Sequence, residues 1–334
     1  MTIKSEEEVL KLLERLPLLK KEINKVIVGQ DEPIEQMIIA LLAGGHALLE
    51  GVPGLAKTLM VRTLARTVNV KFNRIQFTPD LMPSDIIGTE VLEEDHQTGK
   101  KIFKFNHGPI FTNILLADEI NRTPPKTQAA LLEAMQEYEV TYAGTTYPMS
   151  QPFFILATQN PIEQAGTFPL PEAQLDRFLL YIKIGYPSEQ DEEKVLASTT
   201  SNVKPKLNEI ISGQDIVALQ SIVRDVTISQ DVVRFVNKIV RSTRPDTTEV
   251  DYVKQWVRWG AGPRAGQAMI MTAKARALIH ERLAVTVEDV KSVAYPVLRH
   301  RMLLNFRAEA ERINTDMVVE ELLKAIPFEV DLSR

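Results

Sequence analysis

The sequence predicts an α/β fold, in which helices cover both faces of a parallel sheet, followed by a separate helical domain. Two runs, ILLA (residues 114–117) and FFILA (residues 153–157), are apolar at every position, as parallel strands buried on both faces usually are. Strand-like runs alternate with segments of helical spacing as far as the polar stretch near residue 203. Beyond that stretch only helical spacing recurs. We therefore expect an α/β domain over residues 1–203 and a helical lid domain over residues 204–334.

Composition narrows the classes of protein that fit. The 334 residues carry a net charge of -5 and include no cysteine. Disulfides and thiolate metal sites are therefore excluded, and the acidic balance argues against a general nucleic-acid binder. The charged N-terminus does not resemble a signal peptide, and no apolar run approaches the roughly 20 residues of a membrane helix. We expect a cytoplasmic protein without a membrane span.

The expected elements of the α/β domain alternate along the chain. A helix begins near Asp31 and stops at Gly44-Gly45. A strand over residues 46–50 then enters a glycine loop, which opens a helix over residues 58–68. The remaining elements are a strand over 71–77, the buried strand ending at 118, a helix with Pro125 near its start, the buried strand ending at 159, a short helix and strand over 171–184, and a helix over 188–198.

Two predicted hairpins interrupt this alternation. Residues 88–108 have the pattern of a hairpin whose turn contains Gly99, and residues 139–150 have that of a second hairpin turning at Gly144. Both are expected to be insertions that lie outside the core of the sheet.

The loop GVPGLAKT (residues 51–58) almost fits the phosphate-binding pattern G-x-x-x-x-G-K-[ST], but Ala56 replaces the second glycine. Between a strand and a helix, such a loop directs backbone N–H groups and the helix dipole at phosphates. Lys57 would neutralise the β- and γ-phosphates and Thr58 would ligate Mg²⁺. The alternative is a turn with a solvated lysine. Because Pro53-Gly54 can form the tight turn upstream, we expect Ala56 to be helical already, with a negative φ.

Polar residues follow both buried strands. Asp118 and Glu119 end the first, and Asn160 ends the second. In an open α/β sheet, ligands bind beyond the carboxyl ends of the strands. Asp118 would hold Mg²⁺ through water, Glu119 would polarise the water that attacks the γ-phosphate, and Asn160 would orient that water. The alternatives are a charged strand end in solvent and an Asn-Pro turn.

Two arginines are further candidates. Arg177 lies in the helix-to-strand corner PEAQLDRF, where it would either pair with Asp176 or Glu172 or act as an arginine finger on the ATP of a neighbouring subunit. Arg264 lies in GAGPRAGQ, at a glycine-rich helix start. It is either a surface or capping charge, or a sensor that couples the state of the nucleotide to the position of the lid.

The ordered motifs GVPGLAKT, LLADEINR, ATQNP, LPEAQLDRF and GAGPRA resemble those of the MoxR family of AAA+ ATPases over nearly the whole chain. Ala56 is also what the family pattern carries. The resemblance implies a Walker A loop, two Walker B acids (Asp118 and Glu119), sensor 1 (Asn160), an arginine finger (Arg177) and sensor 2 (Arg264). The nucleotide-binding residues it implies are Val28, Gly29 and Gln30 near the adenine, Gly51, Val52, Pro53, Gly54, Leu55, Ala56, Lys57, Thr58 and Leu59 in the loop and early helix, and Arg264.

The function that the resemblance implies is a Mg²⁺-dependent ATPase with ATP as its nucleotide. Such a chain is expected to form a ring, taken to be a hexamer, and to remodel or mature client protein complexes. Partners with von Willebrand factor A domains are expected among the clients. Lys57, Glu119, Asn160 and Arg177 would be the catalytic residues. The two hairpins would be the helix-2 and pre-sensor-1 insertions, which usually face the pore or the partner in such rings.

Two other functions stay open. A nucleotide-gated binding module would bind ATP with little turnover, although Glu119, Asn160 and Arg177 are then unexplained. A nucleic-acid motor is the third reading, since helix-2 insertions also occur in replicative helicases. Against it, the lysines at 100, 101 and 104 of the first hairpin are balanced by acids at 93–95, and neither a zinc site nor an aromatic stacking platform is evident in the sequence.

Overall fold

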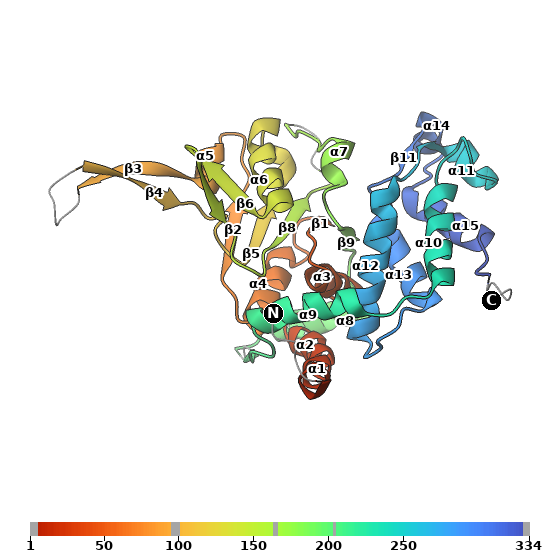
Figure 1. The fold of residues 1–334 in the computed structure, drawn as a ribbon, viewed down its shortest axis with the longest axis horizontal. Coiled ribbons are helices and arrows are strands. Elements are labelled where there is room, and N and C mark those ends of the chain that lie inside the picture. The colour runs from red at the N-terminus through yellow and green to blue at the C-terminus, as the bar shows by residue number, and fades with distance from the viewer. Residues whose placement is uncertain (1–5, 95–100, 163–165, 203–204, 330–334) are drawn as a thin grey trace.

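The computed structural model describes residues 6–94, 101–162, 166–202 and 205–329. Figure 1 shows an α/β body with a long projecting hairpin and, beside it, a body made mostly of helices, which we call the lid. The predicted α/β sheet, the two hairpins and the helical second part are confirmed. The predicted boundary between residues 203 and 204 falls on residues outside the described ranges, so this division stays a proposal.

The central sheet has five strands in the order β2-β5-β8-β1-β9, and all neighbours are parallel. The bounds are β1 Ala47–Glu50, β2 Phe72–Gln76, β5 Ile114–Asp118, β8 Phe154–Gln159 and β9 Leu180–Lys183. Strand β9 pairs with β1 along the full length of both strands. Ala47 lies opposite Leu180, and Glu50 lies opposite Lys183. The strands therefore all begin at one edge of the sheet, which we call the amino edge, and end at the opposite, carboxyl edge.

Helices cover both faces because successive strand residues point in opposite directions. Leu49 and Leu116 join a core with α2, α3 and α4, whereas Leu48 and Leu115 join a second core with α5 and α6. The helices of the α/β body are α1 Glu6–Leu13, α2 Arg15–Ile23, α3 Asp31–Leu42, α4 Lys57–Thr67, α5 Pro83–Ile87, α6 Pro125–Glu137 and α7 Glu172–Leu175, with a 3₁₀ turn at Ile120–Arg122.

The two hairpins touch near their bases. They consist of β3 Gly88–Glu94 with β4 Lys101–His107, and β6 Glu139–Tyr142 with β7 Thr145–Pro148. Ala143 and Gly144 have φ of 48° and 81°, which suits the predicted tight turn, while the turn predicted at Gly99 lies outside the described residues. Phe105 stacks on Tyr147 with ring centroids 4.5 Å apart. The sequence did not reveal this aromatic contact, which joins the first hairpin to the second.

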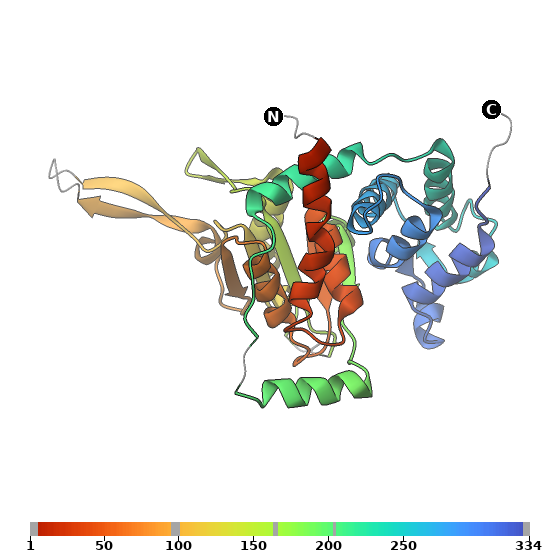
Figure 2. The same cartoon turned by 90° about the horizontal axis from the view of Figure 1, so that it is seen from below.

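The lid consists of helices and one short strand pair. Its helices are α10 Gln230–Ser242, α11 Asp251–Trp256, α12 Pro263–Ile279, α13 Val287–Leu298, α14 Phe306–Ala310 and α15 Thr315–Ala325, and the connecting helices are α8 Glu189–Thr199 and α9 Gly213–Asp225. The antiparallel pair β10 Val257–Trp259 and β11 Leu303–Leu304 was not expected, because strands this short show no periodicity. Figure 2 shows α8 lying apart from the sheet, in agreement with its lack of buried residues. No helix of the described ranges is long and apolar enough to cross a membrane.

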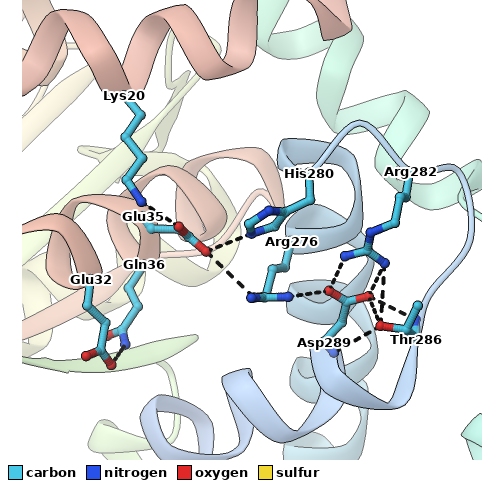
Figure 3. A network of polar contacts seen from close by, with 9 residues as sticks. All are labelled: Lys20, Glu32, Glu35, Gln36, Arg276, His280, Arg282, Thr286 and Asp289. Atoms are coloured by element: carbon cyan, nitrogen blue, oxygen red, sulfur yellow. Dashed lines mark hydrogen bonds and ion pairs between the residues drawn. The ribbon is translucent and has the colours of Figure 1, made fainter.

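A polar network joins the lid to the α/β body (Figure 3). Glu35 of α3 accepts hydrogen bonds from Lys20 Nζ at 2.7 Å and from His280 Nε2 at 3.1 Å. Arg276 of α12 lies 3.6 Å from the same carboxylate through Nε, and donates through Nη1 to Asp289 Oδ1 at 2.6 Å. A chain of contacting charged side chains thus connects α2 and α3 of the body with α12 and α13 of the lid.

Asp289 is the buried end of this network, with a fully buried side chain. Burial raises the pKa of its carboxyl, but hydrogen bonds from Arg282, Thr286 and Arg276 outweigh burial and bring the pKa to about 2. Because that pKa lies below the usual 3.8, Asp289 stabilises the fold fully above about pH 4 and loses this contribution as the pH falls towards 2.

Replacing Asp289 by Asn should lower the free energy of unfolding of the lid by about 3 kcal/mol at neutral pH, since the partly buried Arg276 and Arg282 lose their buried counter-ion. The same variant should lose less stability than the parent between about pH 4 and pH 2. Urea denaturation followed by fluorescence measures both effects, because Trp256 and Trp259, the chain's two tryptophans, lie in the lid.

The matched control is Asp251→Asn, whose side chain is 96% exposed and should change stability by no more than about 0.5 kcal/mol. Equal losses in the two variants would contradict a stabilising role for the buried network.

Candidate functional site

The carboxyl edge of the sheet gathers four of the residues that the sequence singled out. The loop before Lys57 follows β1, Asp118 and Glu119 follow from β5, and Asn160 follows β8. These three strands are neighbours in the sheet, and Glu50 of β1 is level with Gln159 of β8. Parallel pairing therefore brings one cation, two acids and one amide to the same edge.

The loop from Gly51 is shaped by its backbone. A side chain at Gly51 has no room, because a Cβ there would lie 2.9 Å from the carbonyl oxygen of Ile184. Lys57 opens α4, and its Nζ donates to the Gly51 carbonyl at 2.5 Å. Burial lowers the pKa of Lys57, and the charges of Asp118 and Glu119 oppose this shift. The ammonium thus lies in the field of both acids.

The expectation of a negative φ at Ala56 is wrong. Ala56 has φ 56° and ψ 22°, and α4 begins only at Lys57. Gly54, two residues earlier, also has a positive φ, of 89°. Backbone N–H groups converge on an anion when left-handed residues alternate with right-handed ones, so the loop requires a left-handed residue directly before the helix. Alanine meets this requirement at a cost of about 1–2 kcal/mol.

Asp118 is held on both sides by neighbouring strands. Its Oδ1 accepts from Thr158 Oγ1 of β8 at 2.6 Å, and its Oδ2 accepts from Arg74 Nη2 of β2 at 2.6 Å. Sequence reasoning did not single out Arg74 or Thr158. The alternation of side chains along a strand could have indicated both residues. It places Arg74 on the same face of β2 as Gln76. It also places Thr158 on the same side as Asn160, which directly follows β8.

Glu119 has a left-handed backbone, with φ 58° and ψ 49°. Its backbone N–H donates to Thr158 Oγ1 at 2.8 Å, so Thr158 fixes both acids relative to each other. The Glu119 carboxylate accepts from Gln76 Nε2 at 2.8 Å and lies 3.0 Å from Arg122 Nε. These two partners hold the side chain of Glu119 at the carboxyl edge.

Asn160 has one partnered and one unpartnered polar atom. Its Oδ1 accepts from the backbone N–H of Ile162 at 3.1 Å. Its Nδ2 is buried and has no hydrogen-bond partner within the described ranges. Because a buried unpaired donor costs free energy, a phosphate oxygen or a water at this edge would satisfy it.

Residues 28–30 pack beside the same edge. Gln30 Nε2 donates to the Gly185 carbonyl at 2.9 Å, just after β9. Gly29 has φ 71°, and a Cβ there would lie 2.8 Å from Cβ of Asp191. The segment after β9 therefore contacts both this loop and Gly51, through Ile184. Gly29 and Gln30 thus pack against the segment after β9, and the adenine-binding role of Val28, Gly29 and Gln30 stays a prediction.

Arg177 and Arg264 are not part of this cluster. Arg177 precedes β9 and so lies at the amino edge, where it shares a cavity of about 370 Å³ with Arg264 and Asp176. Asp176, one of the two expected partners of Arg177 beside Glu172, instead accepts from Arg301 Nε at 2.7 Å and lies 3.9 Å from Arg264 Nη1. No hydrogen bond or ion pair of the Arg177 side chain is found among the described residues.

The left-handed alanine generates a stability prediction. Ala56→Gly should stabilise the nucleotide-free protein by about 0.5–1 kcal/mol, since relief of left-handed strain exceeds the added entropy of the unfolded chain. The control Ala129→Gly, at an exposed position inside α6, should destabilise by about 1 kcal/mol. Thermal or urea unfolding measures both changes, and equal destabilisation by the two variants would contradict strain at position 56.

Comparison with known proteins agrees with this geometry. Residues 46–180 match the family model of the ATPase family associated with various cellular activities (AAA), and residues 251–322 match that of the AAA lid domain. The chain is 45% identical to Chaperone MoxR1 of Mycobacterium tuberculosis, over 91% of this chain and 80% of that protein. It is 29% identical to Protein MoxR of Paracoccus denitrificans, over 87% of this chain and 89% of that one.

A solved structure supports the same assignment. The crystal structure of a proposed ATPase from Cytophaga hutchinsonii matches with a TM-score of 0.89 and 42% identity, covering 98% of both chains. Fold, motif order and these similarities agree, and the chain belongs to the MoxR family of AAA+ ATPases.

Proposed function

We propose that this chain is a Mg²⁺-dependent ATPase that hydrolyses ATP between the subunits of a ring and uses the energy to remodel or mature client protein complexes. The observation that carries the proposal is the separation of the charges. Lys57, Asp118, Glu119 and Asn160 gather at the carboxyl edge, while Arg177, which has no ion pair with any residue that the structure describes, lies at the amino edge. One chain therefore supplies two incomplete halves of a site.

The carboxyl edge has the groups that phosphate binding and water activation need. Lys57 and the backbone N–H groups from Gly51 to Thr58 would bind the phosphates, with Val52, Pro53, Leu55 and Leu59 shaping the loop. The unpartnered Asn160 Nδ2 would donate to the γ-phosphate or to the attacking water. Glu119 would leave Gln76 and Arg122 to accept the proton of that water.

Thr58 and Asp118 would hold Mg²⁺, which supplies charge neutralisation on the β- and γ-phosphates. Among the described residues, no group of three or more His, Asp or Glu side chains is placed to hold a metal ion unaided. Mg²⁺ commonly binds through one or two protein ligands plus substrate phosphates, which suits this pair. Asp118 Oδ2 would exchange the Arg74 guanidinium for a water ligand of the ion.

The amino edge would serve a neighbouring subunit. The length of β1 separates the two edges, about 13 Å at roughly 3.3 Å per residue. Arg177 and Arg264 are therefore presented away from the Walker A loop of their own chain. We infer that both act in trans, Arg177 as the finger that stabilises charge on the γ-phosphate and Arg264 as the sensor beside it. A closed ring, with six subunits expected, would give every site such a neighbour.

The projecting β3–β4 hairpin would bind the client protein. The relative from Mycobacterium tuberculosis is named a chaperone, and the projecting β3–β4 hairpin exposes Phe103 by 72% and Leu92 by 52%, opposite each other on its strands. A protein client, including one with a von Willebrand factor A domain, fits these apolar side chains. Nucleic acid fits less well, because Lys104 of the hairpin is paired with Glu93 at 3.1 Å.

Glu119→Gln should bind ATP with nearly unchanged affinity but release phosphate at least about 100-fold more slowly, because only proton acceptance is lost. Fluorescent-nucleotide titration and a phosphate-release assay measure the two quantities. Glu133→Gln, on the exposed side of α6, serves as the matched control and should retain turnover. Turnover by Glu119→Gln at the parental rate would remove Glu119 from its role, and would favour a nucleotide-gated binding module if the parent is also inactive.

Mixed assemblies test the supply of arginine in trans. Arg177→Ala subunits keep an intact Walker A loop but lack the finger, and Lys57→Ala subunits keep the finger but lack the phosphate-binding cation. Each should be nearly inactive alone, and a mixture should regain ATPase activity because one subunit type completes the site of the other. A mixture that stays inactive although it assembles would contradict the shared site.

A further inference from the structure

Arg301 of the lid is almost completely buried, with a side chain 3% exposed, and donates to the turn that carries Arg177. The residue lies just after α13. Its Nη2 donates to the carbonyls of Asp176 at 3.4 Å and Phe178 at 2.8 Å, and its Nη1 donates to that of Leu179 at 3.1 Å. Nη1 also donates to the carbonyl of Val297 in α13 at 2.6 Å. The guanidinium thus links α13 to the residues on both sides of Arg177.

The turn has other supports within its own backbone, because the N–H groups of Asp176, Arg177 and Phe178 donate to the carbonyls of Glu172, Gln174 and Leu175. It spans the gap between α7, which ends at Leu175, and β9, which begins at Leu180. The α/β body contributes the His46 carbonyl, which accepts from the Leu179 N–H at 2.7 Å. The lid contributes a second contact through His300, whose Nε2 donates to the Phe178 carbonyl at 2.9 Å. Most side-chain hydrogen bonds that fix this turn therefore come from two consecutive lid residues.

Arg301 is also the nearest cationic partner of the Asp176 carboxylate. Its Nε donates to Asp176 Oδ1 at 2.7 Å, while Arg264 Nη1 lies 3.9 Å from Oδ2. Burial lowers the pKa of Arg301, and the charge and hydrogen bond of Asp176 oppose that shift. With its carboxylate engaged, Asp176 leaves the adjacent Arg177 without an intramolecular counter-ion among the described residues.

We propose that Arg301 is a positioning residue for the arginine finger: it fixes the backbone around Arg177 and occupies Asp176, so that Arg177 stays available to the neighbouring subunit. The proposal rests on the proposed action of Arg177 in trans. Because Arg301 moves with α13, a displacement of the lid would also displace the finger of that subunit. The lid position of one subunit would thereby act on hydrolysis in the next.

The test introduces Arg301→Lys into one of the two subunit types of the mixed assembly at a time. The finger donor carries Lys57→Ala, and the acceptor carries Arg177→Ala. Lysine keeps the charge but lacks the planar fork that reaches three carbonyls and one carboxylate of the turn. Arg301→Lys in the donor should lower kcat of the mixture at least about tenfold, with KM for ATP within about twofold, because the finger is misplaced but nucleotide binding is not. In the acceptor it should change kcat less than about twofold.

A purely structural role would lower activity equally in both placements, and either equal losses or no loss would overturn the proposal. Arg299→Lys in the donor is the matched control, because Arg299 joins the lid to Tyr181 of β9 at 3.2 Å without touching the turn, and it should leave kcat within about twofold. If Arg301→Lys subunits do not fold, Asp176→Asn in the donor breaks the same pair and should give the same asymmetry. An unmodified mixture without activity would instead refute the shared site itself.

Discussion

The parallel direction of β1 and β9 is the constraint on which the rest of the site depends. Because both strands run the same way, the Walker A loop leaves β1 at the carboxyl edge while Arg177 enters β9 at the amino edge. No rotation of side chains can bring the two together across the length of the strands. We propose that a second chain completes the site, because the direction of the strands holds the two edges apart. The lid contacts both the turn before β9 and α3 of the body.

The carboxyl edge holds unfavourable features whose cost contacts with a nucleotide would offset. Ala56 and Glu119 both have left-handed backbones, and Asn160 buries a donor that has no partner among the described residues. Its acids are meanwhile occupied, Asp118 by Arg74 and Glu119 by Gln76 and Arg122. Such strain and substitute pairing are common at functional sites, where the surrounding fold holds residues in positions that local preference alone would not select.

Sequence alone predicted the residues of the carboxyl edge because their positions follow from general rules: apolar runs form buried parallel strands, and polar residues directly after them meet at one edge. It failed at Ala56, since the handedness of one loop residue depends on where the whole loop must direct its N–H groups. It also missed Arg74 and Arg301, whose partners lie 44 and 125 residues away in the chain. The alternation of side chains along a strand places Arg74 on one face of β2. In contrast, no pattern in the sequence near Arg301 indicated the turn that it contacts.

The dependence of ATP turnover per subunit on protein concentration tests directly whether a neighbouring chain completes each site. If each site is completed by a neighbour, turnover per subunit should rise with concentration and reach a plateau where sedimentation shows the assembled ring. Turnover per subunit that stays constant down to concentrations at which the chain is monomeric would contradict the account, because a single chain would then complete its own site.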